Sequence, residues 1–319
     1  MKIISKKNLV IAVDALKNSE LVVIPTETVY GLAANAFSYE AVEKIYHVKK
    51  RPTDNPLIVH ISDTKMLDSV AAQVPPIAYQ LFATFSPVPL TLILKKGNLV
   101  ASNVTNGLDT VAVRIPKHKL TLELLKRLNF PLAAPSANLS GYVSPTKLAH
   151  VVDDLDTLVP FVIDGGDSVL GIESTVLDLT SEFPTILRPG VITKTDLLKV
   201  IPIVVENSVN TVIKSPGTKY KHYAPRITAI GIENYQEAKK IYQENINLNP
   251  VIIGSSNFIY NLSELNSIDL GANVNNITKN YYAALRKADQ NFGFIILETF
   301  KGEEYASLMN RIRKTIGEI

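Results

Sequence analysis

A short polar segment at residues 24–32, IPTETVYGL, contains side chains suited to bind a small polar ligand. Thr26, Glu27, Thr28 and Tyr30 follow an apolar run of strand-forming residues. Hydrogen-bonding side chains placed where a strand ends commonly hold such ligands. An ordinary turn that contains strand-forming residues fits the same letters, so this segment alone leaves both interpretations open.

A basic cluster, Lys49-Lys50-Arg51-Pro52, follows a helical stretch. Arginine can hold a carboxylate or phosphate through a two-pronged fork and lysine adds a point charge, so the cluster suits an anion clamp. Basic residues near a helix C-terminus also interact favourably with the helix dipole without any further function. Both interpretations stay open.

Further polar groups occur among apolar residues. The segment APSANLSG (134–141), followed by Ser144, offers amides and hydroxyls to a phosphate, although a plain turn explains it equally. Arg114 in TVAVRIP needs a partner if it is buried. His60 lies in the apolar run LIVHI, where a hydrogen-bonded core histidine is more common than a ligand. The other candidate groups, each weak alone, are IDGG (163–166), Glu173-Ser174-Thr175 and Leu187-Arg188-Pro189-Gly190.

Several common catalytic signatures are absent from the sequence. It contains no GxxxxGK[ST] phosphate loop, no GxGxxG, no HExxH and no GxSxG. The cysteine count is zero, which excludes disulfides, thiolate zinc sites and cysteine nucleophiles. The histidines lack the spacing of metal ligands, so we expect no structural metal site.

The charge balance gives no support to nucleic acid as the main ligand. The 319 residues include 33 basic and 30 acidic ones, a net charge of +3, whereas nucleic-acid-binding domains are usually more basic. The excess is concentrated locally. Residues 201–230 contain the basic residues Lys214, Lys219, Lys221 and Arg226 and a single acidic residue, Glu206.

The elements that must position these groups can be predicted from apolar runs and helical periodicity. Ser38 predicts the N-cap of a helix over 38–50, and Ser144 with Pro145 predicts the start of a helix over 145–152. A further helix is predicted over 119–128. Eight strands are expected at 21–26, 57–62, 90–96, 110–116, 131–137, 161–166, 174–179 and 185–190.

These patterns divide the chain into three predicted parts. Residues 1–200 should form an α+β (α/β) domain with one large, twisted, mixed sheet. Residues 201–228 read as an interdomain linker, and 229–319 as a smaller, Rossmann-like α/β domain with a parallel sheet. In that domain strands are expected at 227–232, 250–256 and 292–300, and helices at 233–246, 278–291 and 303–316.

The beginning of the chain reads as a first helix rather than a signal peptide, because its apolar run is short and interrupted by Asp14. No apolar stretch of 18 or more residues occurs, so no membrane span is expected. We expect a cytoplasmic location.

Taken together, the motifs resemble those of the YrdC-type threonylcarbamoyl-AMP synthases in their long, two-domain form. The matching segments are IPTETVYGLAANA, KKRPTDNPLIVHI, PSANLSG, GIESTVLDL and LRPG, in that order, and SPGTKYKHYAP is similar to the linker of the long members. Lys50 departs from the pattern, because glycine is frequent at this position in the family, and its charge between the two clamp residues should affect nucleotide affinity.

The resemblance implies formation of L-threonylcarbamoyladenylate and pyrophosphate from L-threonine, bicarbonate and ATP, for modification of an adenosine in tRNA. By resemblance, Lys49 and Arg51 are the catalytic residues. The threonine-binding residues would be Thr28, His60, Arg114, Ala134 and Ser174. The ATP-binding residues would be Arg51, Asn55, Thr110, Ser136, Asn138, Ser144, Arg188 and Tyr223.

The resemblance also implies partners and a cofactor. Mg²⁺ should arrive with ATP rather than in a cage of protein carboxylates. A downstream threonylcarbamoyl transferase machinery and tRNA are the expected partners. We further expect the linker to fold over the cavity of the first domain, with Tyr223 closing on ATP. A non-catalytic RNA-binding protein and a carbamoyl-transfer enzyme are the alternatives considered.

Overall fold

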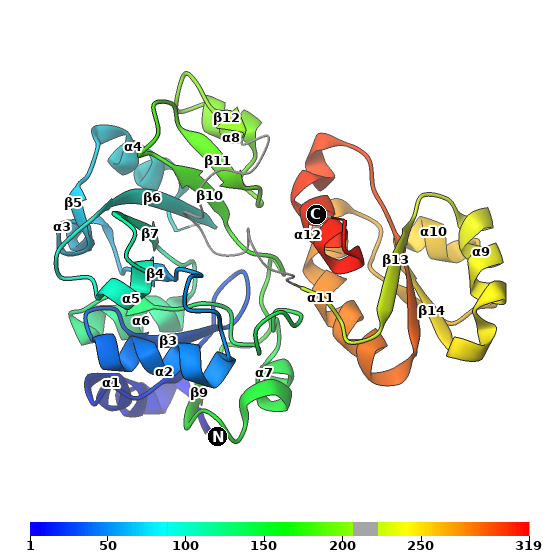
Figure 1. The fold of residues 1–319 in the computed structure, drawn as a ribbon, viewed down its shortest axis with the longest axis horizontal. Helices are drawn as coiled ribbons and strands as arrows, with labels where there is room; N and C mark the ends of the chain where they lie inside the picture. The colour runs from blue at the N-terminus through cyan, green and yellow to red at the C-terminus, as the bar shows by residue number, and fades with distance from the viewer. Residues whose placement is uncertain (88, 207–222, 319) are drawn as a thin grey trace.

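The computed structural model describes residues 1–87, 89–206 and 223–318. These residues form two sheets covered by helices, and the second sheet lies to one side of the first (Figure 1). The basic residues Lys214, Lys219 and Lys221 lie outside the described part of the chain.

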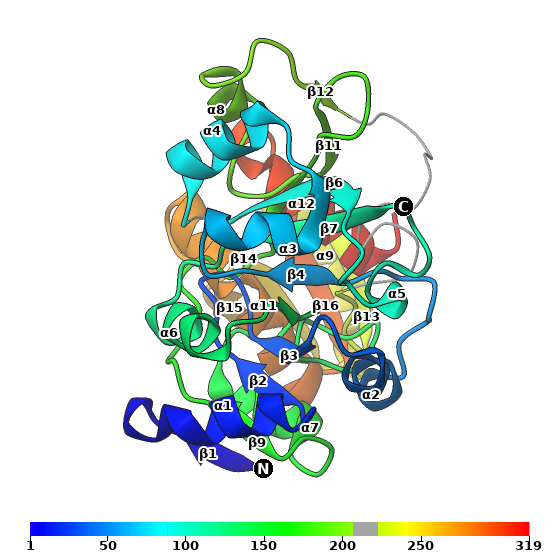
Figure 2. The ribbon, with the colours of Figure 1, turned by 90° about the vertical axis from the view of Figure 1, so that its left-hand side faces the viewer.

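Twelve of the described strands form one mixed sheet. Their order is β1-β9-β2-β3-β8-β4-β7-β6-β10-β11-β12, with β5 paired to β6 outside this path. Figure 2 shows the sheet extending from β1 and β9 at the bottom to β11 and β12 at the top. The strands are β1 (Lys2–Ile4), β2 (Val22–Ile24), β3 (Gly31–Asn35), β4 (Ile58–His60), β5 (Ala71–Gln73), β6 (Leu90–Lys96), β7 (Thr110–Arg114), β8 (Leu132–Ala133), β9 (Phe161–Ile163), β10 (Thr175–Asp178), β11 (Thr185–Arg188) and β12 (Val205–Glu206).

The predicted mixed sheet is confirmed. Parallel pairs such as β4 with β7 alternate with antiparallel pairs such as β6 with β7. Each of the eight predicted strands of this region overlaps an observed one. Strand β3 was not predicted, because its sequence GLAAN consists of residues that are uncommon in strands. It forms between β2 and β8, where tertiary pairing outweighs local propensity.

Helices cover this sheet, and helix α2, which leads into the basic cluster, begins as predicted. Ser38 Oγ accepts a hydrogen bond from the backbone amide of Ala41, which makes Ser38 the N-cap. The helices are α1 (Leu9–Lys17), α2 (Tyr39–Lys49), α3 (Leu67–Val70), α4 (Pro76–Phe85), α5 (Ser102–Thr105), α6 (Lys119–Leu128), α7 (Leu148–Leu155) and α8 (Lys194–Leu198), with short 3₁₀ turns η1 (Lys6–Asn8) and η2 (Thr64–Met66).

Two predicted helix starts were wrong. The helix expected at 145–152 begins later, with Lys147 in the N-cap position of α7. Ser144 does not cap it, because its hydroxyl donates to the carboxylate of Glu173 instead. The first helix also begins later than expected, since Lys2–Ile4 form an edge strand beside β9.

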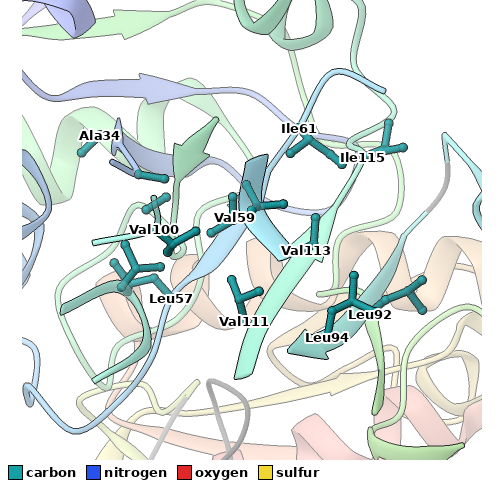
Figure 3. Close-up of a cluster of buried hydrophobic side chains, with 14 of the residues drawn as sticks. Ala34, Leu57, Val59, Ile61, Leu92, Leu94, Val100, Val111, Val113 and Ile115 are labelled. Atoms are coloured by element: carbon teal, nitrogen blue, oxygen red, sulfur yellow. The ribbon is translucent and has the colours of Figure 1, made fainter. Parts of the chain in front are cut away.

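The central strands have two chemically different faces. Figure 3 shows apolar side chains that alternate along the strands and point into the core, among them Val59 of β4 and Val113 of β7. Because successive side chains of a strand point to opposite sides, the intervening residues His60 and Arg114 lie on the other face. One face therefore builds the core and the other presents polar groups.

The second part of the chain forms a four-stranded parallel sheet, as predicted. Its strand order is β13-β16-β14-β15. The elements are β13 (Thr228–Ile232), α9 (Tyr235–Glu244), η3 (Ile246–Leu248), β14 (Pro250–Gly254), α10 (Ser256–Tyr260), β15 (Ser267–Asp269), α11 (Val274–Asn291), β16 (Phe294–Glu298), η4 (Glu303–Tyr305) and α12 (Ala306–Ile316). The short elements α10 and β15 were not predicted.

Helices α11 and α12 lie on the side of this second sheet that faces the first domain (Figure 1). Apolar residues of α11 and α12 pack in one cluster with Val29, Val143 and Ile172 of the first domain. In the same interface Arg286 of α11 pairs with Asp154 of α7. The two domains therefore share an apolar core and a buried ion pair.

Candidate active site

A small cavity of about 70 Å³ lies on the polar face of the first sheet. It combines residues from segments that are far apart in the sequence. Its lining residues are Thr26, Thr28, Val29, Gly31, Arg51, Ile58, His60, Arg114, Ala134, Pro135, Ser136, Glu173, Arg188 and Tyr223. Eight of the residues predicted for the site are among them, namely Thr28, Arg51, His60, Arg114, Ala134, Ser136, Arg188 and Tyr223.

Arg114 occupies the last position of β7 and is held by the polar segment that follows β2. Its Nη2 lies 2.7 Å from Glu27 Oε1 and donates to Thr28 Oγ1 at 3.0 Å. The other carboxylate oxygen of Glu27 accepts from the amide of Lys117. Arg114 Nε is buried without a hydrogen-bond partner among the described residues. The guanidinium is thus oriented by one carboxylate and retains a donor for an anionic ligand.

His60 lies beside Arg114, because β4 and β7 pair with His60 opposite Arg114. Burial and the neighbouring positive charge of Arg114 lower the pKa of His60 to about 3. Its Nδ1 lies 3.3 Å from the carbonyl of Ile58. His60 is therefore neutral at physiological pH and offers an uncharged polar ring to the cavity.

Two members of the basic cluster at the end of α2, Lys49 and Arg51, are buried, whereas residues that only interact with the helix dipole usually lie at the surface. Lys49 is 1% exposed, and its Nζ donates to the carbonyls of Ser136 and Asn138. Burial and the adjacent Arg51 lower the pKa of Lys49 well below its ordinary value. Lys49 thereby ties the end of α2 to the 134–141 loop.

Arg51 follows α2 and contributes directly to the cavity wall. Its Nε donates to the carbonyl of Asn55 at 3.1 Å and its Nη2 to that of Pro56 at 3.0 Å. Burial lowers the pKa of Arg51 to about 10, so the guanidinium keeps its charge at neutral pH. Lys50, between the two, is exposed and adopts a left-handed conformation with φ of 49°.

Arg188 also lines the cavity. Its Nε and Nη2 donate to the carbonyl of Ser174, and Nη2 also donates to Ser174 Oγ. Ser174 Oγ is 2.7 Å from Thr91 Oγ1 on β6. The last strand residue of β11 is thus fixed against the segment that enters β10.

The neighbouring Gly190 lies in close contact with this segment. A Cβ there would stand 2.2 Å from the amide nitrogen of Thr175, so only glycine fits. The LRPG turn is therefore packed directly against the segment that enters β10.

Tyr223 closes the cavity from the side of the second domain. Its ring stacks on Tyr282 of α11 with 5.5 Å between centroids, and its carbonyl accepts from Thr315 of α12. The next residue is bound to the first domain, because the amide of Ala224 donates to the carbonyl of Gly141. Tyr223 itself has φ of 62°, a left-handed conformation.

Six of the predicted residues lie outside the lining. Lys49, Asn55 and Asn138 lie behind the wall, where their side chains or carbonyls support it. Ser144 and Ser174 bond to Glu173 and Arg188. Thr110 begins the strand that Arg114 ends, so the structure does not bring it to this cavity.

Sequence reasoning named Glu173 only within the group Glu173-Ser174-Thr175 and assigned it no role of its own, although it lines the cavity. Neither did it pair Glu27 with Arg114. Glu27 gives one signal: a carboxylate in an apolar strand end needs a buried cation, and Arg114 in a β-run needs an anion. No comparable signal exists for Glu173, whose partners are far along the chain.

A larger space of about 1060 Å³ lies between the domains. Its walls are formed by residues around 186–194 and 300–313, and it contains none of the predicted site residues. We therefore place the candidate site in the smaller cavity, where Arg51, Arg114 and Arg188 converge. Three arginines that line one cavity favour anionic ligands.

The fold and this cavity define a two-domain α/β protein whose candidate site is lined by three arginines. The chain belongs to the Sua5/YciO/YrdC family: residues 14–190 match its model, described as "Telomere recombination". Residues 192–317 match a second model, described as "Threonylcarbamoyl-AMP synthase, C-terminal domain".

Relatives cover both domains. The chain is 41% identical to a threonylcarbamoyl-AMP synthase of Pyrococcus abyssi, over 96% of this chain and 93% of that protein. It is 42% identical to one of Bacillus subtilis, over 96% and 92%. The crystal structure of P. abyssi Sua5 complexed with L-threonine superposes with a TM-score of 0.91 at 38% identity, over 100% of this chain and 98% of that chain.

Proposed function

We propose that this chain forms L-threonylcarbamoyl-AMP and pyrophosphate from L-threonine, bicarbonate and ATP. The observation that carries the proposal is the convergence of Arg51, Arg114 and Arg188 on one buried cavity. It is supported by the similarity over the whole chain to synthases of that name and to a structure solved with L-threonine.

The chemistry needs positioning and charge neutralisation rather than a nucleophilic side chain. The amine of threonine and bicarbonate give a carbamate and water. A carbamate oxygen then attacks the α-phosphorus of ATP, and the bond to pyrophosphate breaks. Both reactants are anions, so fixed cations that bring them together lower the barrier. Exclusion of water protects the carbamate.

The proposed threonine site surrounds Arg114. Its guanidinium would bind the threonine carboxylate through the donors that Glu27 leaves available. Thr28 and neutral His60 would form hydrogen bonds with the other polar groups of threonine. Ala134 and Ser174 complete the proposed threonine set, Ala134 in the cavity wall and Ser174 behind it. Support comes from the ion pair through which Glu27 orients Arg114.

The proposed nucleotide site lies between Arg51 and Arg188. Both guanidinium groups would contact phosphate oxygens, and Ser136 would contribute from the loop that Lys49 supports. Lys49 is proposed to assist in neutralising phosphate or carbamate oxygens. Asn55, Asn138 and Ser144 support the same walls, and the assignment of Thr110 to ATP stays a prediction from resemblance.

The cavity of about 70 Å³ is smaller than a nucleotide requires, because ligand pockets usually measure several hundred Å³. We propose that Tyr223 acts as a lid that opens to admit ATP and then closes on it. The sharp test is Tyr223→Ala with Tyr223→Phe as the matched control. A KM for ATP and a kcat that both stay unchanged in Tyr223→Ala would contradict the lid.

Mg²⁺ would be bound through the phosphates of ATP, where it neutralises their charge. The donor set fits this arrangement: the nearby carboxylates Glu27 and Glu173 are engaged by Arg114 and Arg311. Within the part of the chain that the structure describes, no group of three or more His, Asp or Glu side chains is placed to hold a metal ion.

The decisive experiment is pyrophosphate release from ATP by the purified chain, with threonine and bicarbonate omitted in turn. We expect release that depends on both, and an adenylate product detected by mass spectrometry. Release that ignores the omission of threonine would contradict the proposed function.

Other predictions remain to be tested. No helix among the described residues is long and apolar enough to cross a membrane. The cytoplasmic location, the division into 1–200, 201–228 and 229–319, and the partnership with tRNA and a downstream transferase stay predictions.

A further inference from the structure

Glu173 places a carboxylate in the wall of a cavity whose other charged lining residues are Arg51, Arg114 and Arg188. The residue precedes β10 and is 7% exposed. Its Oε1 accepts from Ser144 Oγ at 2.7 Å. A negative charge at this point opposes the binding of a phosphate chain unless a cation compensates for it.

The compensating cation comes from the second domain. Arg311 of α12 lies with its Nε 3.2 Å from Glu173 Oε2, and its Nη2 donates to the carbonyl of the same residue at 3.3 Å. Arg311 is 0% exposed and is the largest fully buried side chain among the described residues. Tyr282 of α11 donates its hydroxyl to the same carboxylate oxygen at 2.9 Å.

Arg311 also reaches the other cationic wall. Its Nη1 donates to the carbonyl of Pro189, the residue that follows Arg188. Arg188 in turn donates to the carbonyl of Ser174, the residue that follows Glu173. One side chain of the second domain therefore braces both segments that carry Glu173 and Arg188.

The charge state of Glu173 agrees with this geometry. Burial raises the pKa of Glu173. The positive charges of Arg311 and Arg188 and the hydrogen bond from Ser144 outweigh burial and hold this pKa below its ordinary value. The carboxylate of Glu173 is thus ionised and paired with Arg311, and this pairing reduces its repulsion of an anionic ligand.

We propose that Arg311 and Tyr282 are positioning residues of the nucleotide site. They neutralise and hold Glu173, and Arg311 fixes the segment that carries Arg188, so that the phosphate chain of ATP meets cations only. This inference rests on the proposed function for the identity of the nucleotide. It makes the second domain part of the active site through charge compensation, in addition to the lid proposed for Tyr223.

The test is a double-mutant cycle on the full chain. Binding of α,β-methylene-ATP, whose α–β linkage cannot be cleaved, is measured by calorimetry. Arg311→Met should weaken binding about tenfold, because Glu173 becomes an uncompensated charge. Adding Glu173→Gln should restore most of the affinity, because the repulsive charge is removed. Equal affinities of Arg311→Met and the wild type, or no recovery in the double variant, would overturn the proposal.

A milder pair of variants covers the case in which Arg311→Met does not fold. Tyr282→Phe deletes one hydrogen bond to Glu173 and should weaken binding about two- to fivefold. Glu173→Gln in the same chain should reverse that loss, whereas a purely structural role would give additive losses. Additive losses would therefore overturn the proposal.

Arg286→Met is the matched control. Arg286 is also a buried arginine of the second domain, and it pairs with Asp154 across the same interface but does not line the cavity. It should lose thermal stability and keep the affinity for the nucleotide within about twofold. An equal loss of affinity in Arg286→Met would show that any damage to the interface suffices and would overturn the specific role of Arg311.

This measurement separates the inference from the proposed function. A wild-type chain that binds the nucleotide without threonine-dependent pyrophosphate release would contradict the proposed reaction but leave the cycle valid. A wild-type chain that does not bind the nucleotide would overturn both.

Discussion

Arg51 combines two tasks that its surroundings reveal. It lines the cavity, and it also donates to the carbonyls of Asn55 and Pro56 behind it. A guanidinium held in this way is oriented before a ligand arrives, which reduces the entropy lost on binding. The same contacts join Arg51 to the segment that follows α2.

Arg51→Ala should lower kcat/KM for ATP by about 10- to 150-fold, which corresponds to the loss of a charge-assisted contact of roughly 1.5–3 kcal/mol. Steady-state pyrophosphate release measures it, with circular dichroism to confirm that the protein stays folded. Arg51→Lys is the matched control and should retain an intermediate activity. Unchanged turnover in Arg51→Ala would rule out the proposed role.

The lowered pKa of His60 predicts that the free energy of unfolding depends on pH. Its folded pKa of about 3 lies below the value of 6.5 for an exposed histidine, so the folded protein binds fewer protons than the unfolded chain between these pH values. The stability associated with neutral His60 is therefore present above pH 6.5 and is lost as the pH falls toward 3.

The check compares the wild type with His60→Asn by denaturant unfolding at pH 7 and pH 5. Over this interval the wild type should lose about 2 kcal/mol more than the variant. Equal losses in the two proteins would show that His60 is not a buried neutral histidine.

At the scale of elements, helix α2 shows how local rules fix the start and the end of a helix. Ser38 caps its start, and Lys50 ends it in a left-handed conformation. Such a position favours glycine, because a Cβ there is disfavoured. Lys50 stands where glycine is frequent in the family, and the sequence predicts that its charge affects nucleotide affinity. Its left-handed conformation adds a second consequence, because it strains the end of the helix.

Lys50→Gly should raise the free energy of unfolding by up to about 1 kcal/mol, since it removes the strain of a non-glycine residue in this conformation. Chemical denaturation measures the change. Lys50→Val serves as the opposite control and should destabilise the protein. A loss of stability in Lys50→Gly would contradict this account.

Strands with β-branched and apolar residues could be predicted from the sequence, and β4, β6 and β7 lie where their patterns indicate. Strand β3 could not, because its small residues acquire strand structure only through pairing with β2 and β8. The predicted start of α7 was wrong for a related reason. The hydroxyl of Ser144 bonds to Glu173, far along the chain, instead of capping the helix.

The candidate site divides in the same way. The sequence motifs predicted that Arg51, Arg114 and Arg188 belong to one site, and all three line one cavity in the structure. The partners of these residues could not be predicted. Arg311 lies 138 residues from Glu173 in the sequence, and only the tertiary fold brings them into contact.

For the whole molecule, Asp289 of α11 anchors the start of the second domain. Its carboxylate accepts from the amides of Arg226 and Ile227, from Arg226 Nε and from the hydroxyl of Tyr142 in the first domain. These hydrogen bonds from charged and backbone donors explain why the pKa of Asp289 is lowered although burial opposes it.

Asp289→Ala should lower the free energy of unfolding by about 1–3 kcal/mol, because four hydrogen bonds lose their buried acceptor. Denaturant unfolding of the full chain measures this loss. Glu244, an exposed acidic residue of the same domain, provides the control: Glu244→Ala should change stability by less than about 0.5 kcal/mol. Equal effects of the two substitutions would contradict the anchoring role.

The pairing of Glu173 with Arg311 has a consequence for chimaeric proteins. The boundary between the two family models, at residues 190–192, invites the exchange of second domains between relatives. A hybrid whose incoming domain lacks a cation opposite Glu173 would bury an uncompensated carboxylate beside the arginines. Successful recombination at this boundary therefore requires that the acid and the base be inherited as a pair.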